Sequence, residues 1–257
     1  MTRLPFSFVL GGKNSAVLLP QWDCAATDTA MSDGRRVLSL RWTSPTLFAV
    51  SVAVTLWPNA AAVDSLLRFH NHNATHVSPL LSDACALDAT WVLPADSTLE
   101  TALGSDSSPR DFANVSYALL AGSSHPFRPG DYWDGTHADG TTRYAGAGRS
   151  SNGQMPFWAI ESEQRGAGLF IGLGWSGQWS ANFSSRSAPA AITQSGAAMV
   201  EVRGTASLEG ARFVLLPEEG VRSLRVLVTS YARTELAGAG YGAEVLPWAP
   251  EGAENGP

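Results

Sequence analysis

The chain has 257 residues, enough to bury about 70 to 75% of the surface of its unfolded chain in one large domain or two small ones. Its net charge of −6, and the absence of any Lys/Arg cluster, argue against nucleic acid as a partner, because such binding needs a basic face. No run approaches the roughly 18 apolar residues of a membrane span, and residues 1–12 contain no signal-peptide core, so we expect a soluble chain with no membrane partner.

Short apolar runs separated by turns predict an all-β fold, and sandwiches of about 200 to 250 residues commonly form one domain. In the first half, strands are expected at residues 6–10, 16–19, 37–42, 47–57, 65–71, 87–93 and 115–120. Residues 47–57 are largely apolar at both alternating positions, which predicts a central strand. Residues 121–154 are rich in Gly and Asp and predict a long irregular segment, of the kind that is often functional or mobile.

The second half begins with a predicted hairpin of residues 157–161 and 169–173. Further strands are expected at residues 190–194, 198–203 and 211–216, and then from residue 221 to 230, followed by a helical turn. Residues 237–257 are rich in Gly, Ala, Pro and Glu with little to bury, which predicts a linker or a disordered tail. The expected organisation is therefore one domain over residues 1–236 with a tail over 237–257.

The hairpin ends in a bend of small residues flanked by two indoles, Gly174-Trp175-Ser176-Gly177-Gln178-Trp179. Indole faces match the C–H faces of a pyranose, and small neighbours let a sugar ring approach. Trp175, Trp179 and the more distant Trp133 are candidate stacking surfaces, with Ser176 and Gln178 as polar contacts. The alternative is that the two indoles of the bend fill the core of a sandwich.

Acidic residues offer only a loose catalytic or metal set. A retaining glycosidase needs two carboxyl groups about 5 to 5.5 Å apart. Asp131 and Asp134 share one Gly-flanked loop and, with Asp139, could contact a ligand, a partner domain or calcium, although the spacing is not that of a helix-loop-helix calcium site. A solvated loop is the alternative. The sequence therefore predicts no metal and no cofactor.

Histidines gather in Phe69-His-Asn-His-Asn-Ala-Thr-His76, where alternation along a strand puts His70 and His72 on one face. Zinc binding would need a third ligand that the sequence does not identify, so a polar strand end leading into a turn is preferred. The Gly-x-Ser-x-Gly and Gly-x-x-x-x-Gly-Lys motifs are both absent. No catalytic set is predicted.

Cys24 and Cys85 are compatible with one disulfide or with two free thiols, and their spacing does not suggest zinc. Three Asn-x-Ser/Thr sequences, at Asn73, Asn114 and Asn182, would accept glycans only in a eukaryotic secretory pathway. Both features stay open at the level of sequence.

Three segments occur in an order that resembles the N-terminal β-supersandwich domain of melibiase-type, GH36-like α-galactosidases. They are Gly148-Arg-Ser-Ser-Asn-Gly-Gln-Met-Pro156, Gly172-Leu-Gly-Trp-Ser-Gly-Gln-Trp179 and Phe213-Val-Leu-Leu-Pro-Glu-Glu-Gly-Val-Arg-Ser223. Leu67-Arg-Phe-His-Asn71 and the residues around Gly122 and Phe127 add to the resemblance, which spans about residues 5–232. Two departures, Pro217-Glu-Glu-Gly220 and Arg128, concern loops.

The resemblance implies a large antiparallel, galactose-mutarotase-like β-supersandwich. It also implies an accessory role beside a (β/α)8 barrel, which carries both catalytic aspartates in that family and has no counterpart among these residues. The partner would then be that barrel or a galactoside-type carbohydrate, and a homo-oligomer is left open. The alternatives are a stand-alone carbohydrate-binding sandwich and an independently catalytic glycosidase.

Overall fold

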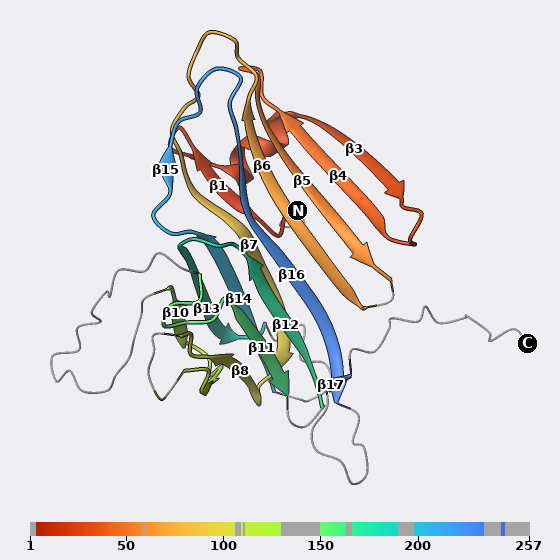
Figure 1. Cartoon of the computed structure of the whole chain (residues 1–257), viewed down its shortest axis with the longest axis vertical. Coiled ribbons are helices and arrows are strands. Elements are labelled where there is room, and N and C mark those ends of the chain that lie inside the picture. The colour runs from red at the N-terminus through yellow and green to blue at the C-terminus, as the bar shows by residue number, and fades with distance from the viewer. Residues whose placement is uncertain are drawn as a thin grey trace, which may run out of the picture.

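Two antiparallel sheets form the described part of the chain (Figure 1), which in this computed structural model comprises residues 4–58, 60–105, 109, 111–129, 150–162, 166–189, 198–233 and 243–244. The first sheet contains, in spatial order, β10 (Ser124–Phe127), β13 (Trp179–Ser187), β14 (Met199–Leu208), β7 (Leu81–Pro94), β1 (Ser7–Leu10) and β2 (Lys13–Asn14), with β15 (Arg212–Phe213) also paired to β7.

The second, larger sheet runs in the order β3 (Asp23–Ala30), β4 (Arg36–Thr43), β5 (Phe48–Trp57), β6 (Ala62–Asn71), β16 (Gly220–Arg233), β12 (Ala167–Gly174), β11 (Phe157–Ser162), β8 (Ser97–Ala102) and β9 (Asn114–Ala118). A two-residue strand, β17 (Ala243–Glu244), pairs with the end of β16. The helical elements of the described residues are α1 (Ser15–Leu18) and a 3-10 turn at Leu19–Gln21. The predicted all-β sandwich is confirmed.

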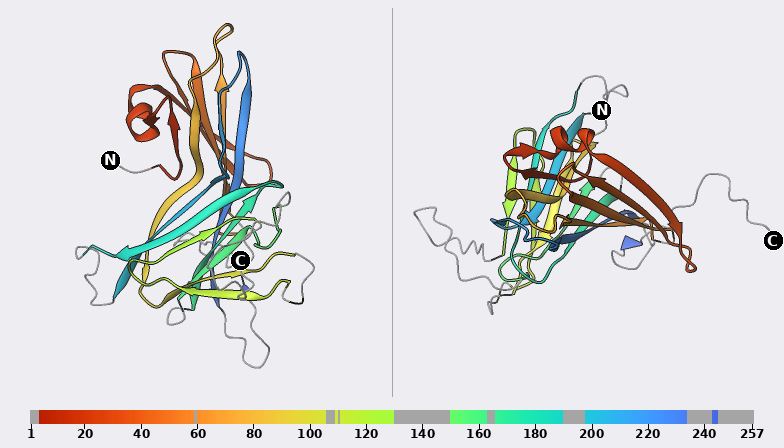
Figure 2. Two further views of the ribbon diagram at one scale, coloured as in Figure 1. Left: turned by 90° about the vertical axis from the view of Figure 1, so that its left-hand side faces the viewer. Right: turned by 90° about the horizontal axis from the view of Figure 1, so that it is seen from above.

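Two long strands, β7 and β16, pass through both halves of the molecule. Residues 220–229 of β16 pair with β6, and residues 225–232 pair with β12 on the other side of the strand. Likewise β7 begins between β1 and β15 and then pairs with β14. Each long strand therefore joins a lobe built from N-terminal strands to a lobe built from the central hairpin, as the two further views show (Figure 2).

Each lobe has its own apolar core. In the N-terminal lobe Phe8 and Phe48 pack on Phe69, and Leu19 closes the cluster from the helical segment. In the other lobe the cluster centres on Trp158, with Phe127, Trp179 and Phe183 around it. Aromatic side chains that bury 150 to 250 Å² each dominate such cores.

Strand alternation decides which faces are buried. In β5, Phe48, Val50 and Val52 point into the core, while Ser51 and Ala53 are half-buried on the other face of the sheet. In β13 the inward positions begin with Trp179 and include Phe183. The larger sheet therefore has one face toward the core and one outer face.

Some predicted elements differ in the structure. Residues 16–19 are helical because the Asn14 side chain accepts a hydrogen bond from the N–H of Ala16, and Pro20 fits the first turn of the 3-10 segment that follows. Strand β16 runs on to Arg233, where a helical turn was expected after Ser230. Strands β3, β8, β10 and β13 were not predicted. The strand expected at residues 190–194 lies outside the described residues.

No helix among the described residues is long and apolar enough to cross a membrane. Within the predicted tail, Ala243–Glu244 form β17, and the other residues of 237–257 lie outside the described part. The division at residue 236 stays a prediction.

Candidate functional site

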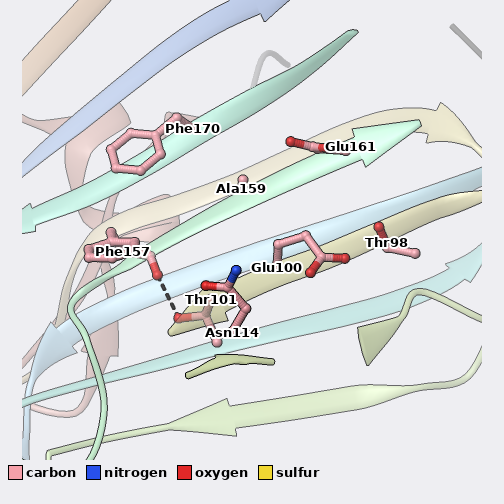
Figure 3. Close-up of a pocket in the computed structure, with 8 residues that line it drawn as sticks. All are labelled: Thr98, Glu100, Thr101, Asn114, Phe157, Ala159, Glu161 and Phe170. Atoms are coloured by element: carbon pink, nitrogen blue, oxygen red, sulfur yellow. Dashed lines mark hydrogen bonds between the residues drawn. The ribbon is translucent and has the colours of Figure 1, made fainter. Parts of the chain in front are cut away.

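The outer face of the larger sheet carries two shallow hollows. The first, called here the acidic hollow, has a volume of about 450 Å³ and is shown in Figure 3. It is lined by Thr98, Glu100, Thr101, Asn114, Phe157, Ala159, Glu161 and Phe170. These residues come from β8, β9, β11 and β12, which the register aligns side by side.

Two aromatic rings form one wall of the acidic hollow. The rings of Phe157 and Phe170 are stacked, with centroids 5.7 Å apart and planes 30° apart. Ala159 lies between its paired neighbours Phe170 of β12 and Glu100 of β8 (Figure 3). An aromatic face beside hydrogen-bonding groups suits a ligand with one apolar and several polar surfaces, such as a sugar.

The two carboxylates of this hollow are held in place by hydroxyl groups. Ser116 Oγ donates to Glu100 Oε1 over 2.5 Å, and the Tyr231 hydroxyl donates to Glu161 Oε1. Tyr231 can reach Glu161 because the residue beneath its ring is Gly168, where a Cβ would lie 2.7 Å from the Tyr231 oxygen. The acceptors are therefore oriented before any ligand arrives.

The second hollow, called here the basic hollow, has a volume of about 510 Å³ and lies on the outer face of β4, β5, β6 and β16. It is lined by Arg41, Ala49, Ser51, Arg68, Phe69, His70, His72, Gly220, Val221 and Arg222. The rings of His70 and His72 are stacked with centroids 3.9 Å apart, and Arg41 Nη2 lies 2.7 Å from His72 Nε2. The expectation that these histidines share one face is confirmed.

The pKa of His72 lies below its usual value of 6.5. Desolvation is the largest cause, followed by the charges of His70 and Arg41, and Glu218 acts in the opposite direction. A neutral His72 ring can accept the hydrogen bond that the Arg41 guanidinium donates. Among the described residues no group of three or more His, Cys, Asp or Glu could hold a metal ion.

One residue of the predicted Trp bend, Trp175, contacts a residue that lines the basic hollow. Trp175 is half-buried, and the guanidinium carbon of Arg222 lies 5.1 Å from the centre of its ring. Ser176 and Gln178 are exposed. The Trp175 ring also packs against the core cluster around Trp158, and its role as a ligand or partner contact stays a prediction.

Trp179 is a core residue. Its side chain is 0% exposed, its ring packs edge-to-face on Trp158 at 5.3 Å, and its indole N–H donates to the Ser150 carbonyl over 2.8 Å. A stacking role needs an exposed ring face, so the assignment of Trp179 as a sugar platform is corrected. Strand alternation explains its position, because Trp179 opens β13 on the inward face.

Five other predicted site residues are one tryptophan, two aspartates and two cysteines. Trp133, Asp131 and Asp134 lie outside the described residues. Cys24, exposed on β3, and Cys85, half-buried on β7, are free thiols in different sheets, which corrects the disulfide alternative.

The three sequons all lie on described residues. Asn73 is half-buried in a turn, where its side chain accepts hydrogen bonds from Thr75 and His76. Asn114 is exposed on β9, and Asn182 is half-buried on β13, so their use as glycan acceptors stays a prediction.

A feature that the sequence reasoning missed is a set of exposed apolar residues in the loops at one end of the N-terminal lobe, called here the apolar end. It comprises five exposed large apolar residues: Leu47, Val77, Leu80, Val214 and Leu216. They belong to three loops that meet at the top of Figure 1. The first joins β4 to β5, the second joins β6 to β7, and the third joins β15 to β16.

Asn71 ties these loops together. It is 2% exposed, and its amide donates to the carbonyl oxygens of His76, Leu215 and Leu216 over 2.8 to 3.1 Å. The loop that contains Leu47 is linked to the loop that follows β6, because the Leu47 carbonyl accepts a hydrogen bond from the N–H of His72. Leu47 itself has φ of 65°, a left-handed conformation that is unusual for a bulky residue. Strained backbone of this kind tends to occur at contact sites.

No protein-family profile and no curated protein sequence matches this chain. Solved structures do match in fold. The α-galactosidase from Lactobacillus brevis has a TM-score of 0.58 at 12% identity. The GH36 α-galactosidase AgaA from Geobacillus stearothermophilus, in a complex with raffinose, has a TM-score of 0.60 at 14% identity, and the galactosidase domain of the α-galactosidase-sucrose kinase AgaSK has 0.56 at 12%.

These matches cover 90% of this chain but only 29 to 30% of the galactosidase chains. The chain thus spans less than a third of the length of the enzymes that it resembles. Its architecture is that of a β-sandwich portion of GH36 α-galactosidases, as the sequence resemblance implied.

Proposed function

We propose that this chain is a non-catalytic accessory domain of an α-galactosidase-like glycoside hydrolase, which packs on a catalytic (β/α)8 barrel and shapes the rim of its active site. The observation that carries the proposal is the fold match, which takes in nearly the whole of this chain and about 30% of each GH36 enzyme. A domain that recurs as one part of a larger enzyme is expected to have a surface made for the other part.

The apolar end is the surface that we assign to the barrel. Leu47, Val77 and Leu216 are each about half exposed, at 49%, 55% and 57%. Grouped apolar side chains of this kind mark interaction sites on soluble proteins, whereas single exposed ones are ordinary. The hydrogen bonds of Asn71 hold the loops in one arrangement, so little ordering entropy remains to be lost on docking.

The test is to add this chain to a GH36 barrel expressed without its own sandwich, and to measure complex formation and the hydrolysis of an aryl α-galactoside. We expect a one-to-one complex, hydrolysis well above that of the barrel alone, and a rise in the Tm of this chain. The variants Leu47→Asp and Leu216→Asp should abolish the complex. The matched control Leu56→Asp changes an exposed leucine of β5 outside the apolar end and should not. A barrel that neither binds this chain nor gains activity from it would refute the proposal.

The second candidate is a stand-alone carbohydrate-binding module that uses the acidic hollow. The stacked pair Phe157 and Phe170, beside oriented acceptors on Glu100 and Glu161, favours it. Titration with raffinose or stachyose tests it. Saturable binding that is lost in Phe170→Ala, together with no effect on any barrel, would put the module ahead. The absence of binding at millimolar concentrations of either sugar would rule out the carbohydrate-binding module.

A further inference from the structure

The basic hollow concentrates positive charge on a chain whose net charge is −6. Its arginines form one row across the sheet, because Arg41 is paired with Ser51, Ser51 with Arg68, and Arg68 with Arg222. Neighbouring strands are about 4.8 Å apart, so this register places the three side chains over a span of about 15 Å on one face.

These three arginines, like Arg212 on β15, have no carboxylate partner, whereas six other arginines of the described residues have one. The paired arginines are Arg35, Arg36, Arg128, Arg186, Arg203 and Arg225. No ion pair joins Arg41, Arg68 or Arg222 to a carboxylate within the described part of the chain. Glu218, whose charge acts on His72, is exposed and forms no ion pair with them.

Uncompensated like charges in this register are unfavourable. Arg68 and Arg222 lie directly opposite each other on paired strands, an arrangement that destabilises a sheet. On the same face the positive charge of Arg225 is compensated by an ion pair with Asp64. A bound anion would provide the compensation that the row lacks.

The floor of the hollow is made of small residues, which leaves room between the cationic side chains. Ser51 lies between Arg41 and Arg68, and Ala49 and Gly220 flank His70 in the next row. A Cβ at Gly220 would lie 2.7 Å from the His70 ring, so glycine permits the position of this ring. The buried Nδ1 of His70 has no hydrogen-bond partner among the described residues.

We propose that the basic hollow binds a small oxyanion, a carboxylate or phosphate group carried on a molecule about the size of one sugar ring. Guanidinium groups present paired donors that match the oxygens of either group, which makes arginine the usual residue for recognising them. A volume of about 510 Å³ is within the range of small-molecule sites. The guanidinium carbon of Arg222 lies 5.1 Å from the centre of the Trp175 ring, a cation–π contact that restrains this side chain.

The test is calorimetric titration of the whole chain with inorganic phosphate, with D-galacturonate and, as the neutral reference, with D-galactose, all at constant ionic strength. We expect saturable binding of at least one oxyanion and much weaker or no binding of galactose at this hollow. Arg68→Gln should weaken oxyanion binding at least tenfold, because charge-assisted hydrogen bonds are lost. The control Arg36→Gln, on the same strand as Arg41 and paired with Asp28, should leave binding within twofold.

A second variant keeps the proposal testable if Arg68→Gln folds poorly. Ser51→Glu places a carboxylate between Arg41 and Arg68, so it should abolish oxyanion binding and raise the Tm. Preference for phosphate over galacturonate would identify a tetrahedral ligand, and the reverse preference a carboxylate. The proposal is overturned if neither oxyanion binds saturably, or if Arg68→Gln and Ser51→Glu bind as tightly as the wild type.

Discussion

Replacing Trp179 separates a core role from a binding role. In Trp179→Ala the edge-to-face contact with Trp158 is lost, and a cavity forms in a side-chain site that is 0% exposed. Such truncations cost about 3 to 5 kcal/mol. The lost hydrogen bond to the Ser150 carbonyl contributes about 1 kcal/mol within that range. We therefore expect the free energy of unfolding to fall by about 4 kcal/mol.

For a chain of this length, 1 kcal/mol corresponds to roughly 2 to 4 °C, so the Tm should fall by about 8 to 16 °C. Urea unfolding followed by circular dichroism measures the free energy directly. The control is Trp175→Ala, which removes a half-buried ring and its contact with Arg222 and should cost only about 1 to 2 kcal/mol. If Trp179→Ala were within 1 kcal/mol of the wild type, or less damaging than Trp175→Ala, the placement of Trp179 in the core would be wrong.

Three further predictions concern single groups. Cys24 is exposed, whereas burial raises the pKa of the Cys85 thiol. Iodoacetamide should therefore alkylate Cys24 at least tenfold faster than Cys85, which peptide mass mapping would measure. Equal alkylation rates would contradict this prediction. NMR titration should place the pKa of His72 below 6.5, and Arg41→Gln should raise it. The unfolded chain binds a proton at His72 more readily than the folded chain does. The free energy of unfolding should therefore fall as the pH drops from about 6.5 through the pKa of folded His72. A His72 titration midpoint above 6.5 would refute desolvation as the dominant effect on this pKa. Asn71→Ala removes a buried amide that donates hydrogen bonds to three loop carbonyls. The free energy of unfolding, measured in urea, should fall by about 2 to 3 kcal/mol. A fall of less than about 1 kcal/mol would contradict the role of Asn71 in holding the loops together.

Apolar alternation was enough to predict much of the fold. Strand β5 was found because its inward positions carry Phe48, Val50 and Val52, and the hairpin of β11 and β12 because two apolar runs flank a short turn. Strand β3 was not predicted because all eight of its residues are exposed, so its sequence shows no alternation between apolar and polar positions. The helix at Ser15–Leu18 depends on one cap, Asn14, which outweighs the β preference of a short apolar run.

The candidate sites were harder to predict because they depend on pairing between strands far apart in the sequence. The shared face of His70 and His72 could be predicted, since it follows from alternation along a single strand. The sequence reasoning did not find the row of Arg41, Arg68 and Arg222, because only the register of β4, β5, β6 and β16 brings these residues together. The apolar end was missed for the same reason, since its residues come from three separate loops.

The most direct test of the accessory-domain proposal is amide hydrogen exchange of this chain, measured alone and with a GH36 barrel added in trans. The proposal predicts slower exchange in the loops of the apolar end, at residues 44–47, 72–80 and 214–219, and unchanged exchange in β8 and β9 around the acidic hollow. Unchanged exchange throughout, or protection confined to the acidic hollow, would contradict docking through the apolar end.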